Sequence, residues 1–241
     1  MSTFVLVHGS WHDGSAWNAV IKHLEAKGHQ AFAPTIAGHG KGVSKNVNHA
    51  QCTQSIVDYI VGKDITDIVL LGHSFGGTVI AKVAEAIGDR IRRLIFFNAF
   101  VLNDGESLRD NIPPHHQALL DKLARESDDR TMMMPFEIWR EAFLNDADLD
   151  LAKFSYTQLS SEPYQPWIDK LDMKQFYALT IPKSYLYCSE DNALPQGEWG
   201  WHPRMSSRLG LFRLVQMPGS HEVMFSNPGG LAEKVIAAGR D

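Results

Sequence analysis

The sequence contains little cysteine, no surplus of positive charge and no long apolar run. Only two cysteines, Cys52 and Cys188, occur in 241 residues, too few for a disulfide framework. We expect two free, buried thiols in a reducing cytoplasm, with a single bridge between them as the alternative. The chain carries 23 basic and 28 acidic residues, a net charge of -5, which gives nucleic acid or an anionic membrane no electrostatic attraction. No apolar run approaches the ~18 residues of a membrane span, and the run Phe4–Val7 is too short for a secretion signal. These absences favour a soluble, cytoplasmic protein with neither a nucleic-acid nor a membrane partner.

What the sequence does contain is a regular alternation of short apolar runs and amphipathic stretches. Hydrophobic residues make up 44% and charged residues 21% of a 27.0 kDa chain, which fits one globular domain over residues 1–241. Continuous apolar runs are typical of parallel strands covered on both faces, and their alternation with helices predicts a doubly wound α/β sheet. The expected strands are Phe4–Val7, Gln30–Ala33, Ile68–Leu71, Leu94–Phe97, Ser184–Cys188 and Phe212–Val215, and the expected helices are Ala16–Lys27, His49–Val61, Gly77–Ile87 and Pro228–Ala238.

The stretch from about residue 103 to residue 180 breaks this alternation. It contains no convincing strand, but it has helical patterns at His115–Arg125 and Phe136–Phe143. We expect a helical cap inserted over the carboxyl ends of the strands, since insertions at that edge often carry function. The alternative is a helical layer that only covers one edge of the sheet.

The strongest motif is Gly72–Gly77, GHSFGG, which fits the G-x-S-x-G pattern of a nucleophile elbow. In such an elbow a serine lies in a sharp turn between a strand and a helix, so the neighbouring residues must be small. Here an apolar run precedes the motif and an amphipathic helical pattern follows it. Ser74 is therefore the predicted nucleophile.

A serine hydroxyl becomes a good nucleophile only when a base accepts its proton. His221 is the predicted base, because it follows the last expected strand, at the edge where ligands bind in open α/β sheets. Asp191 directly follows the strand Ser184–Cys188 and is predicted to orient the imidazole. Asp104 is a rival for that role and Glu190 a weaker one.

Acyl transfer also needs backbone donors for the oxyanion that develops on the substrate. The predicted donors are the N–H of Phe75, which follows the nucleophile, and the N–H of Ser10, where Gly9 permits close approach of the backbone. The residues predicted to bind substrate are Trp11, His12, Met133 and Trp139, with Met132, Met134, Phe136 and Phe143 as further candidates from the insertion. Their apolar character favours an uncharged, hydrophobic or aromatic ester, while the alternative for the insertion residues is packing within the insertion.

The chain resembles the α/β-hydrolase family, and within it the branch that contains plant methylesterases, hydroxynitrile lyases and related bacterial carboxylesterases. The resemblance spans nearly the whole chain and rests on FVLVHGSWH (4–12), LGHSFGG (71–77), LIFFNAF (94–100), SEDNALP (189–195) and GSH (219–221). It implies a catalytic triad of Ser74, Asp191 and His221, and a short, mainly parallel sheet of six strands with helices on both faces and a helical cap.

Two departures from the branch bear on the chemistry that the resemblance implies. Lyases that use the triad carry a lysine directly after the catalytic histidine, where this chain has Glu222. Other lyases carry a larger polar residue in place of Gly9. Both departures point to ester hydrolysis, and Ser74 excludes dehalogenase or epoxide hydrolase chemistry, which needs an aspartate in the elbow.

We therefore expect a cofactor-free serine hydrolase that cleaves a hydrophobic or aromatic carboxylic ester through an acyl-enzyme, with a homodimer left open. The alternatives are carbon–carbon bond hydrolysis or a lyase reaction on the same triad, cofactor-free dioxygenation, and a slow-turnover small-molecule receptor. No metal is expected, because His8 and His12 lack the glutamate of an H-E-x-x-H site. No nucleotide cofactor is expected either, since the glycine-rich residues 38–42 match no phosphate-binding loop.

Overall fold

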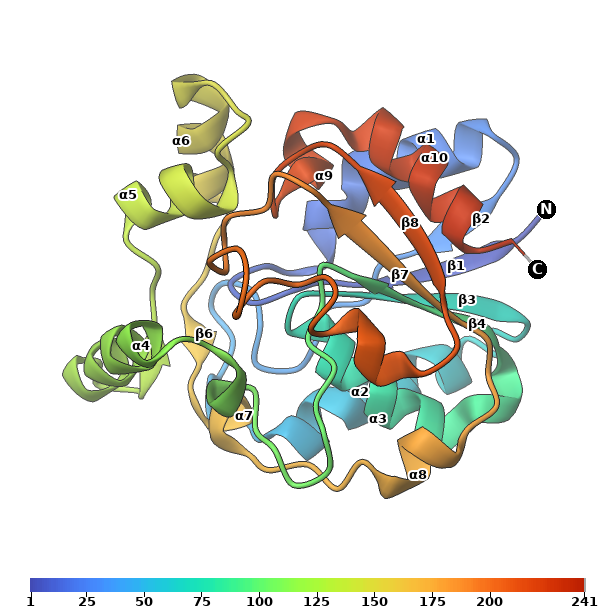
Figure 1. Cartoon of the computed structure of the whole chain (residues 1–241), viewed down its shortest axis with the longest axis horizontal. Coiled ribbons are helices and arrows are strands. Elements are labelled where there is room, and N and C mark those ends of the chain that lie inside the picture. The colour runs from blue at the N-terminus through green and yellow to red at the C-terminus, as the bar shows by residue number, and fades with distance from the viewer. Residues whose placement is uncertain (241) are drawn as a thin grey trace.

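The computed structural model of the chain describes residues 1–240 and is built on one six-stranded sheet (Figure 1). The strands run in the order β2-β1-β3-β4-β7-β8, and every neighbouring pair is parallel. Their bounds are β1 (Thr3–Val7), β2 (Gln30–Phe32), β3 (Ile68–His73), β4 (Ile91–Phe97), β7 (Lys183–Cys188) and β8 (Arg213–Met217). Each of the six expected strands overlaps one of these, so the predicted doubly wound sheet is confirmed.

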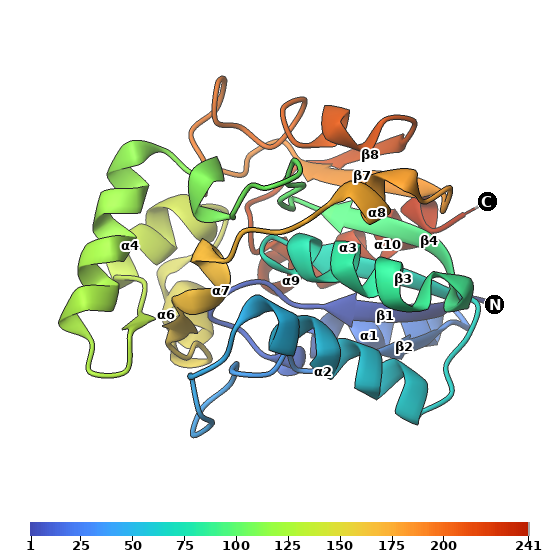
Figure 2. The ribbon, with the colours of Figure 1, turned by 90° about the horizontal axis from the view of Figure 1, so that it is seen from below.

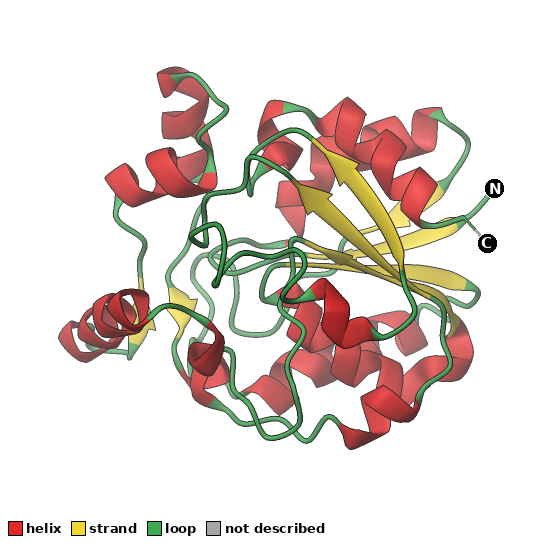
Figure 3. Ribbon diagram, viewed as in Figure 1, coloured by secondary structure: helices red, strands yellow, loops and turns green. Residues whose placement is uncertain are grey.

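Helices cover both faces of the sheet (Figures 2 and 3). One face carries α1 (Asn18–Ala26), α9 (Val223–Ser226) and α10 (Pro228–Ala238), and the other carries α2 (His49–Gly62), α3 (Gly76–Ile87) and α8 (Lys174–Ala178). Short 3-10 helices lie at Gly14–Trp17, Gly88–Arg90, Arg109–Asn111 and Ser206–Leu209. The four helices expected from the sequence all form.

The continuous apolar runs follow from this double coverage. Every residue of β3 is buried. Leu70 packs into the core shared with α2 and α3, while Val69 and Leu71 pack into the core shared with α1 and α10. Because successive side chains point to opposite faces of a strand, a strand covered on both sides needs apolar residues at every position.

The chain between β4 and β7 forms a group of helices at one end of the sheet (Figure 1). We call residues 112–168 the cap. The cap contains α4 (Pro114–Glu126), α5 (Phe136–Ile138) continued by a π-helix (Trp139–Phe143), α6 (Leu149–Thr157) and α7 (Gln165–Ile168). The helix α8 falls within the predicted insertion but packs against α3, where the Phe176 N–H donates to Glu85 Oε1 (3.1 Å).

One expectation about this region is wrong, because residues 103–180 do contain strands. β5 (Thr131–Met132) and β6 (Glu162–Pro163) pair in an antiparallel arrangement. Strands of two residues are too short to leave an alternating pattern in the sequence. Their pairing joins two segments that are far apart in the chain, so no local signal predicts it.

Among residues 1–240, none of the helices is both long and apolar enough to cross a membrane. Cys52 and Cys188 are free and buried, as expected. Burial raises the pKa of both thiols, which keeps them protonated and chemically inert.

Candidate active site

The loops after the strands carry the predicted site residues to one edge of the sheet. Ser10 and Trp11 follow β1, Ser74 follows β3, Asp191 follows β7 and His221 follows β8. Parallel strands place their carboxyl ends at a common edge, so these residues, distant in sequence, meet there. The cap covers the same edge (Figure 1).

Ser74 lies in a tight turn between β3 and α3. Its φ is 52°, in the left-handed region that residues with a side chain rarely adopt. Hydrogen bonds close the turn, from Ser74 N to Phe97 O (3.2 Å) and from Gly77 N to Ser74 O (3.0 Å). A Cβ at Gly72 would lie 2.5 Å from the carbonyl oxygen of Gly76, so this position admits only glycine. The strained serine and the surrounding glycines have the geometry of a nucleophile elbow.

His221 and Asp191 form a buried hydrogen-bonded pair. The distance from His221 Nδ1 to Asp191 Oδ2 is 2.6 Å, and Asp191 Oδ1 accepts a hydrogen bond from the Ala193 N–H (2.9 Å). The indole of Trp201 stacks on the His221 ring with 5.1 Å between the ring centroids. Together these contacts fix the imidazole with Nδ1 toward the carboxylate, the orientation that a triad requires.

The charges around His221 favour its protonated form. Burial opposes protonation, but the negative charge of Asp191, the hydrogen bond that Asp191 accepts from His221 and the charge of Glu222 together raise the pKa of His221 above its usual value. An imidazole of raised pKa is a stronger base toward a serine hydroxyl.

The two rival acids are engaged elsewhere. Asp104 Oδ1 accepts a hydrogen bond from the Met173 N–H (2.9 Å), and Asp104 Oδ2 lies 3.4 Å from Lys174 Nζ. Glu190 is exposed, although its backbone N–H donates to Gly219 O (3.2 Å). Of the acids considered from the sequence, Asp191 is therefore the one that lies against the imidazole of His221.

Ser74 and His221 both line a cavity between the sheet and the cap. The space between the protein atoms here is ≈ 580 Å³, part of it open to solvent. In the described part of the chain the lining has one further titratable side chain, His116. The remaining lining side chains are aromatic or aliphatic: Trp11, Phe100, Ile112, Leu119, Leu120, Met134, Ile138, Ala142, Phe143, Trp167, Ala193, Leu194 and Trp201.

Of the four predicted substrate contacts, the structure places only Trp11 in this lining. Trp139 is fully buried, donates its indole N–H to Ser155 Oγ (3.0 Å) and stacks on Phe143, which lines the cavity instead. In the same way Met134, and not Met133, lines the cavity. Trp139 and Phe143 are the first and last residues of a π-helix, whose side-chain spacing differs from the 3.6-residue period of an α-helix.

The two predicted oxyanion donors lie on two segments, Ser10 in the loop after β1 and Phe75 in the elbow between β3 and α3. Ser10 and Phe75 are buried, and within residues 1–240 neither backbone N–H donates to a protein acceptor. A Cβ at Gly9 would lie 2.9 Å from His73 Nδ1 and 3.0 Å from Ser74 Cβ. The loop after β1 therefore approaches the elbow as closely as a glycine backbone allows.

His12, the fourth predicted contact, pairs with a buried acid instead of lining the cavity. His12 Nε2 lies 3.0 Å from Glu222 Oε2, and both side chains are about 2% exposed. Burial opposes ionisation of Glu222, but the charge of His12 and the hydrogen bond between them lower the pKa of Glu222 to about 2. The residue after His221 is thus a buried carboxylate bound to the loop after β1.

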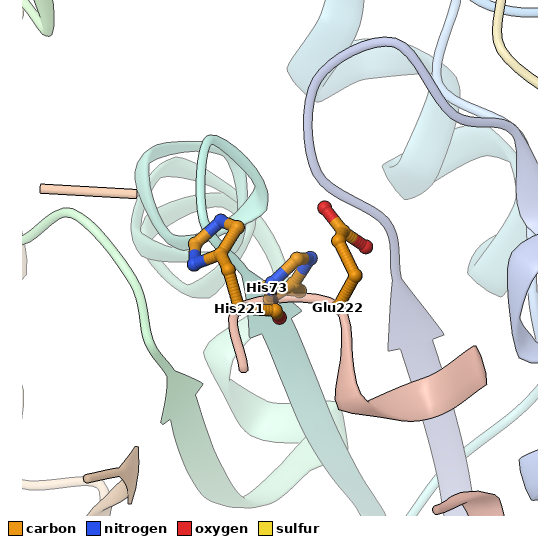
Figure 4. A group of neighbouring side chains, drawn as sticks. All are labelled: His73, His221 and Glu222. Atoms are coloured by element: carbon orange, nitrogen blue, oxygen red, sulfur yellow. Dashed lines mark hydrogen bonds between the residues drawn. The ribbon is translucent and has the colours of Figure 1, made fainter. Parts of the chain in front are cut away.

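His73, His221 and Glu222 form a compact group beside the elbow (Figure 4). One nitrogen or oxygen of each lies within 4.8 Å of those of the other two, a spacing that raises the question of a metal ion. Each residue already has a partner in the protein. His221 Nδ1 contacts Asp191, Glu222 Oε2 contacts His12, and His73 Nε2 lies 3.1 Å from the carbonyl oxygen of His221. These hydrogen bonds hold the three side chains together without an ion, while His73 Nδ1 is buried without a hydrogen-bond partner among the described residues.

A second buried acid, Glu162 in β6, lies near the site, and no sequence pattern indicates it. The Glu162 side chain is fully buried, and its Oε2 lies 3.0 Å from His39 Nε2. The His39 ring stacks on the ring of Phe75. Glu162 lies in the cap, where no strand was expected, and His39 belongs to the loop after β2. Only tertiary structure brings the two together.

The fold and the site together define a class of protein. The serine lies in an elbow, and an aspartate and a histidine follow it in chain order and pair at the carboxyl edge of a parallel sheet. This arrangement is typical of α/β enzymes that use an activated serine.

Comparisons with known proteins agree with this class. The profile described as the alpha/beta hydrolase family matches residues 4–234. A carbendazim hydrolyzing esterase of Nocardioides sp. is 30% identical over 99% of this chain and 100% of its own, and methylesterase 1 of Arabidopsis thaliana is 26% identical over 95% and 93%. A solved structure is described as an extracellular alpha/beta-hydrolase from a Paenibacillus species with structural and functional homology to tobacco salicylic acid binding protein 2. It covers 100% of both chains at 45% identity, with a TM-score of 0.98. This chain therefore belongs to the α/β hydrolase family.

Proposed function

We propose that this protein hydrolyses an uncharged, hydrophobic or aromatic carboxylic ester without a cofactor, using Ser74, His221 and Asp191. The observation that carries the proposal is that the elbow serine and the histidine of a buried histidine–aspartate pair line one apolar cavity.

The reaction follows from the roles of these groups. Ser74 Oγ attacks the ester carbonyl carbon while His221 Nε2 takes the hydroxyl proton. The tetrahedral intermediate collapses, the bond to the alkoxy oxygen breaks, and His221 returns its proton to the leaving alcohol. A water molecule then loses a proton to His221 and attacks the acyl-enzyme, which releases the carboxylic acid and restores Ser74. Throughout, Asp191 holds the Nδ1–H of His221 and stabilises the imidazolium.

The negative charge that develops on the carbonyl oxygen needs donors that are already in place. The N–H groups of Ser10 and Phe75, both without a protein acceptor among the described residues, are suited to this role. Removing one such donor in other enzymes costs about 3–4 kcal/mol of transition-state stabilisation.

The lining of the cavity supports the proposed substrate class. Apart from the reacting groups and His116, it offers aromatic and aliphatic surface, which favours an apolar ligand over a sugar or a phosphate ester. The relatives point the same way, since their names describe a carbendazim hydrolyzing esterase, a pyrethroid hydrolase and methylesterases.

Partners and cellular location stay predictions. A cytoplasmic location is tested by cell fractionation. Recovery of the protein from the medium would contradict it, and the Paenibacillus relative is described as extracellular. A homodimer is tested by light scattering.

The experiment that tests the function is a panel of aryl esters, alkyl esters and lactones, assayed with the wild-type protein and with Ser74→Ala. We expect hydrolysis of aryl esters and a loss of at least ~10³-fold in kcat for the variant, with an unchanged unfolding midpoint. A fluorophosphonate should label Ser74 in the wild-type protein.

Other outcomes would point to the other candidate functions. Turnover of the true substrate that survives Ser74→Ala, with no covalent label, would favour cofactor-free oxygenation by the His221–Asp191 pair. Cyanohydrin cleavage without ester hydrolysis would favour a lyase, and ligand binding with negligible turnover would favour a receptor.

A further inference from the structure

The cap holds the loop after β1 through every polar atom of Trp11. The Trp11 N–H donates to Glu162 Oε2 (2.8 Å), the Trp11 carbonyl accepts from the Ser160 N–H (2.8 Å), and the indole N–H donates to Met132 O (2.9 Å). All three partners lie in or beside the small sheet of β5 and β6.

Trp11 needs such restraint because its backbone is strained. Its φ is 64°, a conformation that costs an ordinary residue of order 1–3 kcal/mol and persists only where its surroundings enforce it. Trp11 directly follows Ser10, whose N–H is a proposed oxyanion donor. The contacts that enforce the conformation of Trp11 therefore also fix the position of Ser10.

Glu162 is the central residue of this arrangement. Its second oxygen, Oε1, accepts a hydrogen bond from the indole N–H of Trp167 (3.0 Å), and the same N–H lies 3.2 Å from Ser10 Oγ. His39 lies on the other side of the carboxylate, with Nε2 3.0 Å from Oε2. One fully buried carboxylate thus binds the backbone of Trp11 directly and contacts Ser10 through Trp167.

We propose that Glu162 is a positioning residue for the oxyanion hole, which sets the location of the Ser10 N–H through Trp11 and Trp167. This inference rests on the proposed function. It makes the cap part of the catalytic machinery and not only a cover for the cavity.

The role has a distinctive kinetic consequence. Charge on the carbonyl oxygen is larger in the tetrahedral transition state than in the bound ester, so a displaced N–H weakens transition-state binding more than ground-state binding. Loss of the positioning contact should therefore lower kcat and leave KM nearly unchanged. A role restricted to packing of the cap would instead change the unfolding midpoint or KM.

The test is Glu162→Gln, which keeps the shape of the side chain but replaces one acceptor oxygen with an NH₂ group that cannot accept the N–H of Trp11 or of Trp167. Outright loss of an oxyanion donor costs ~10²–10³-fold in kcat, so we expect a displaced donor to cost ~10–100-fold, with KM for an aryl ester within threefold of the wild-type value. An arylboronic acid, which forms a tetrahedral adduct with an active serine, should bind more weakly by a similar factor.

Tyr164→Phe is the matched control. It removes a cap hydrogen bond, from the Tyr164 hydroxyl to Asp121 Oδ1 (2.6 Å), that does not involve Trp11, and kcat should stay within twofold. If Glu162→Gln does not fold, Trp167→Phe removes the N–H shared by Glu162 and Ser10 and should lower kcat and boronate affinity in parallel by several fold.

Wild-type kcat and wild-type boronate affinity in the folded Glu162→Gln variant, or in folded Trp167→Phe where that variant replaces it, would overturn the inference. That result would leave the proposed function intact as long as Ser74→Ala abolishes ester hydrolysis. Persistent hydrolysis in Ser74→Ala would overturn the proposed function itself, so the two failures are distinguishable.

Discussion

Replacing Glu222 by glutamine should remove a stabilisation that depends on pH in a defined way. Glu222 is buried, and its pKa is about 2 in the folded protein against an ordinary value of 4.5. A difference of about two and a half pH units, at ~1.4 kcal/mol per unit, corresponds to roughly 3–4 kcal/mol of stability in the ionised state. Because the folded pKa lies below the unfolded one, this contribution is fully present above pH 4.5 and is lost as the pH falls through about 2. About 2 kcal/mol of it should disappear between pH 7 and pH 3.

Urea unfolding of the wild-type protein and of Glu222→Gln, at pH 7, 5 and 3, measures this contribution. The difference in unfolding free energy between the two proteins should shrink by about 2 kcal/mol as the pH falls from 7 to 3. Glu233→Gln is the control, because Glu233 is exposed, pairs with Lys27 at 3.2 Å, and should show a difference of less than ~1 kcal/mol at every pH. A difference for Glu222→Gln that is constant from pH 7 to pH 3 would refute the assignment of Glu222 as an ionised partner of His12.

Three further predictions concern the triad and the elbow. Ester hydrolysis should rise with pH through a midpoint above 6.5, because the pKa of His221 is raised and only its neutral form accepts the serine proton; a midpoint in kcat/KM below pH 6 would contradict this. Asp191→Asn should lower kcat by ~10⁴-fold in steady-state kinetics, while Asp104→Asn changes it less than twofold, and equal losses would count against the assignment. Gly72→Ala should destabilise the protein by ~1–3 kcal/mol in urea unfolding. Gly62→Ala is the control and should not, because nothing lies within 4 Å of its new Cβ. Equal stability of the two variants would disprove the close approach of Gly72 to the Gly76 carbonyl oxygen.

The sheet could be predicted from the sequence because its signal is local. Strand β3 is buried on both faces, so its residues before His73 are apolar or glycine, and the run is visible without knowledge of its neighbours. The elbow is local in part, since Gly72 and Ser74 are constrained by one turn, whereas Gly76 is required by the approach of the Val7 and His8 carbonyl groups. Asp191 and His221 were found because each directly follows a strand, and the edge where parallel strands end brings them to 2.6 Å.

The cap could not be predicted at the same level because its structure depends on contacts between distant segments. The pairing of β5 with β6 and the contacts of Glu162 with Trp11 and His39 join parts of the chain that carry no shared local pattern. Of the candidates from the insertion, Phe143 and Met134 line the cavity, while Trp139 is fully buried within the cap. Glu222 was noticed only as a departure from the lyases, and its pairing with His12 was not foreseen.

The most direct test of the central claim is mass spectrometry of the protein quenched within milliseconds of mixing with a p-nitrophenyl ester. We predict a mass increase equal to that of the acyl group, located on Ser74 in the peptide that carries the elbow, and formed as rapidly as the first equivalent of nitrophenol. Release of nitrophenol at the same rate by Ser74→Ala, with no acyl adduct on Ser74 of the wild-type protein, would contradict the account.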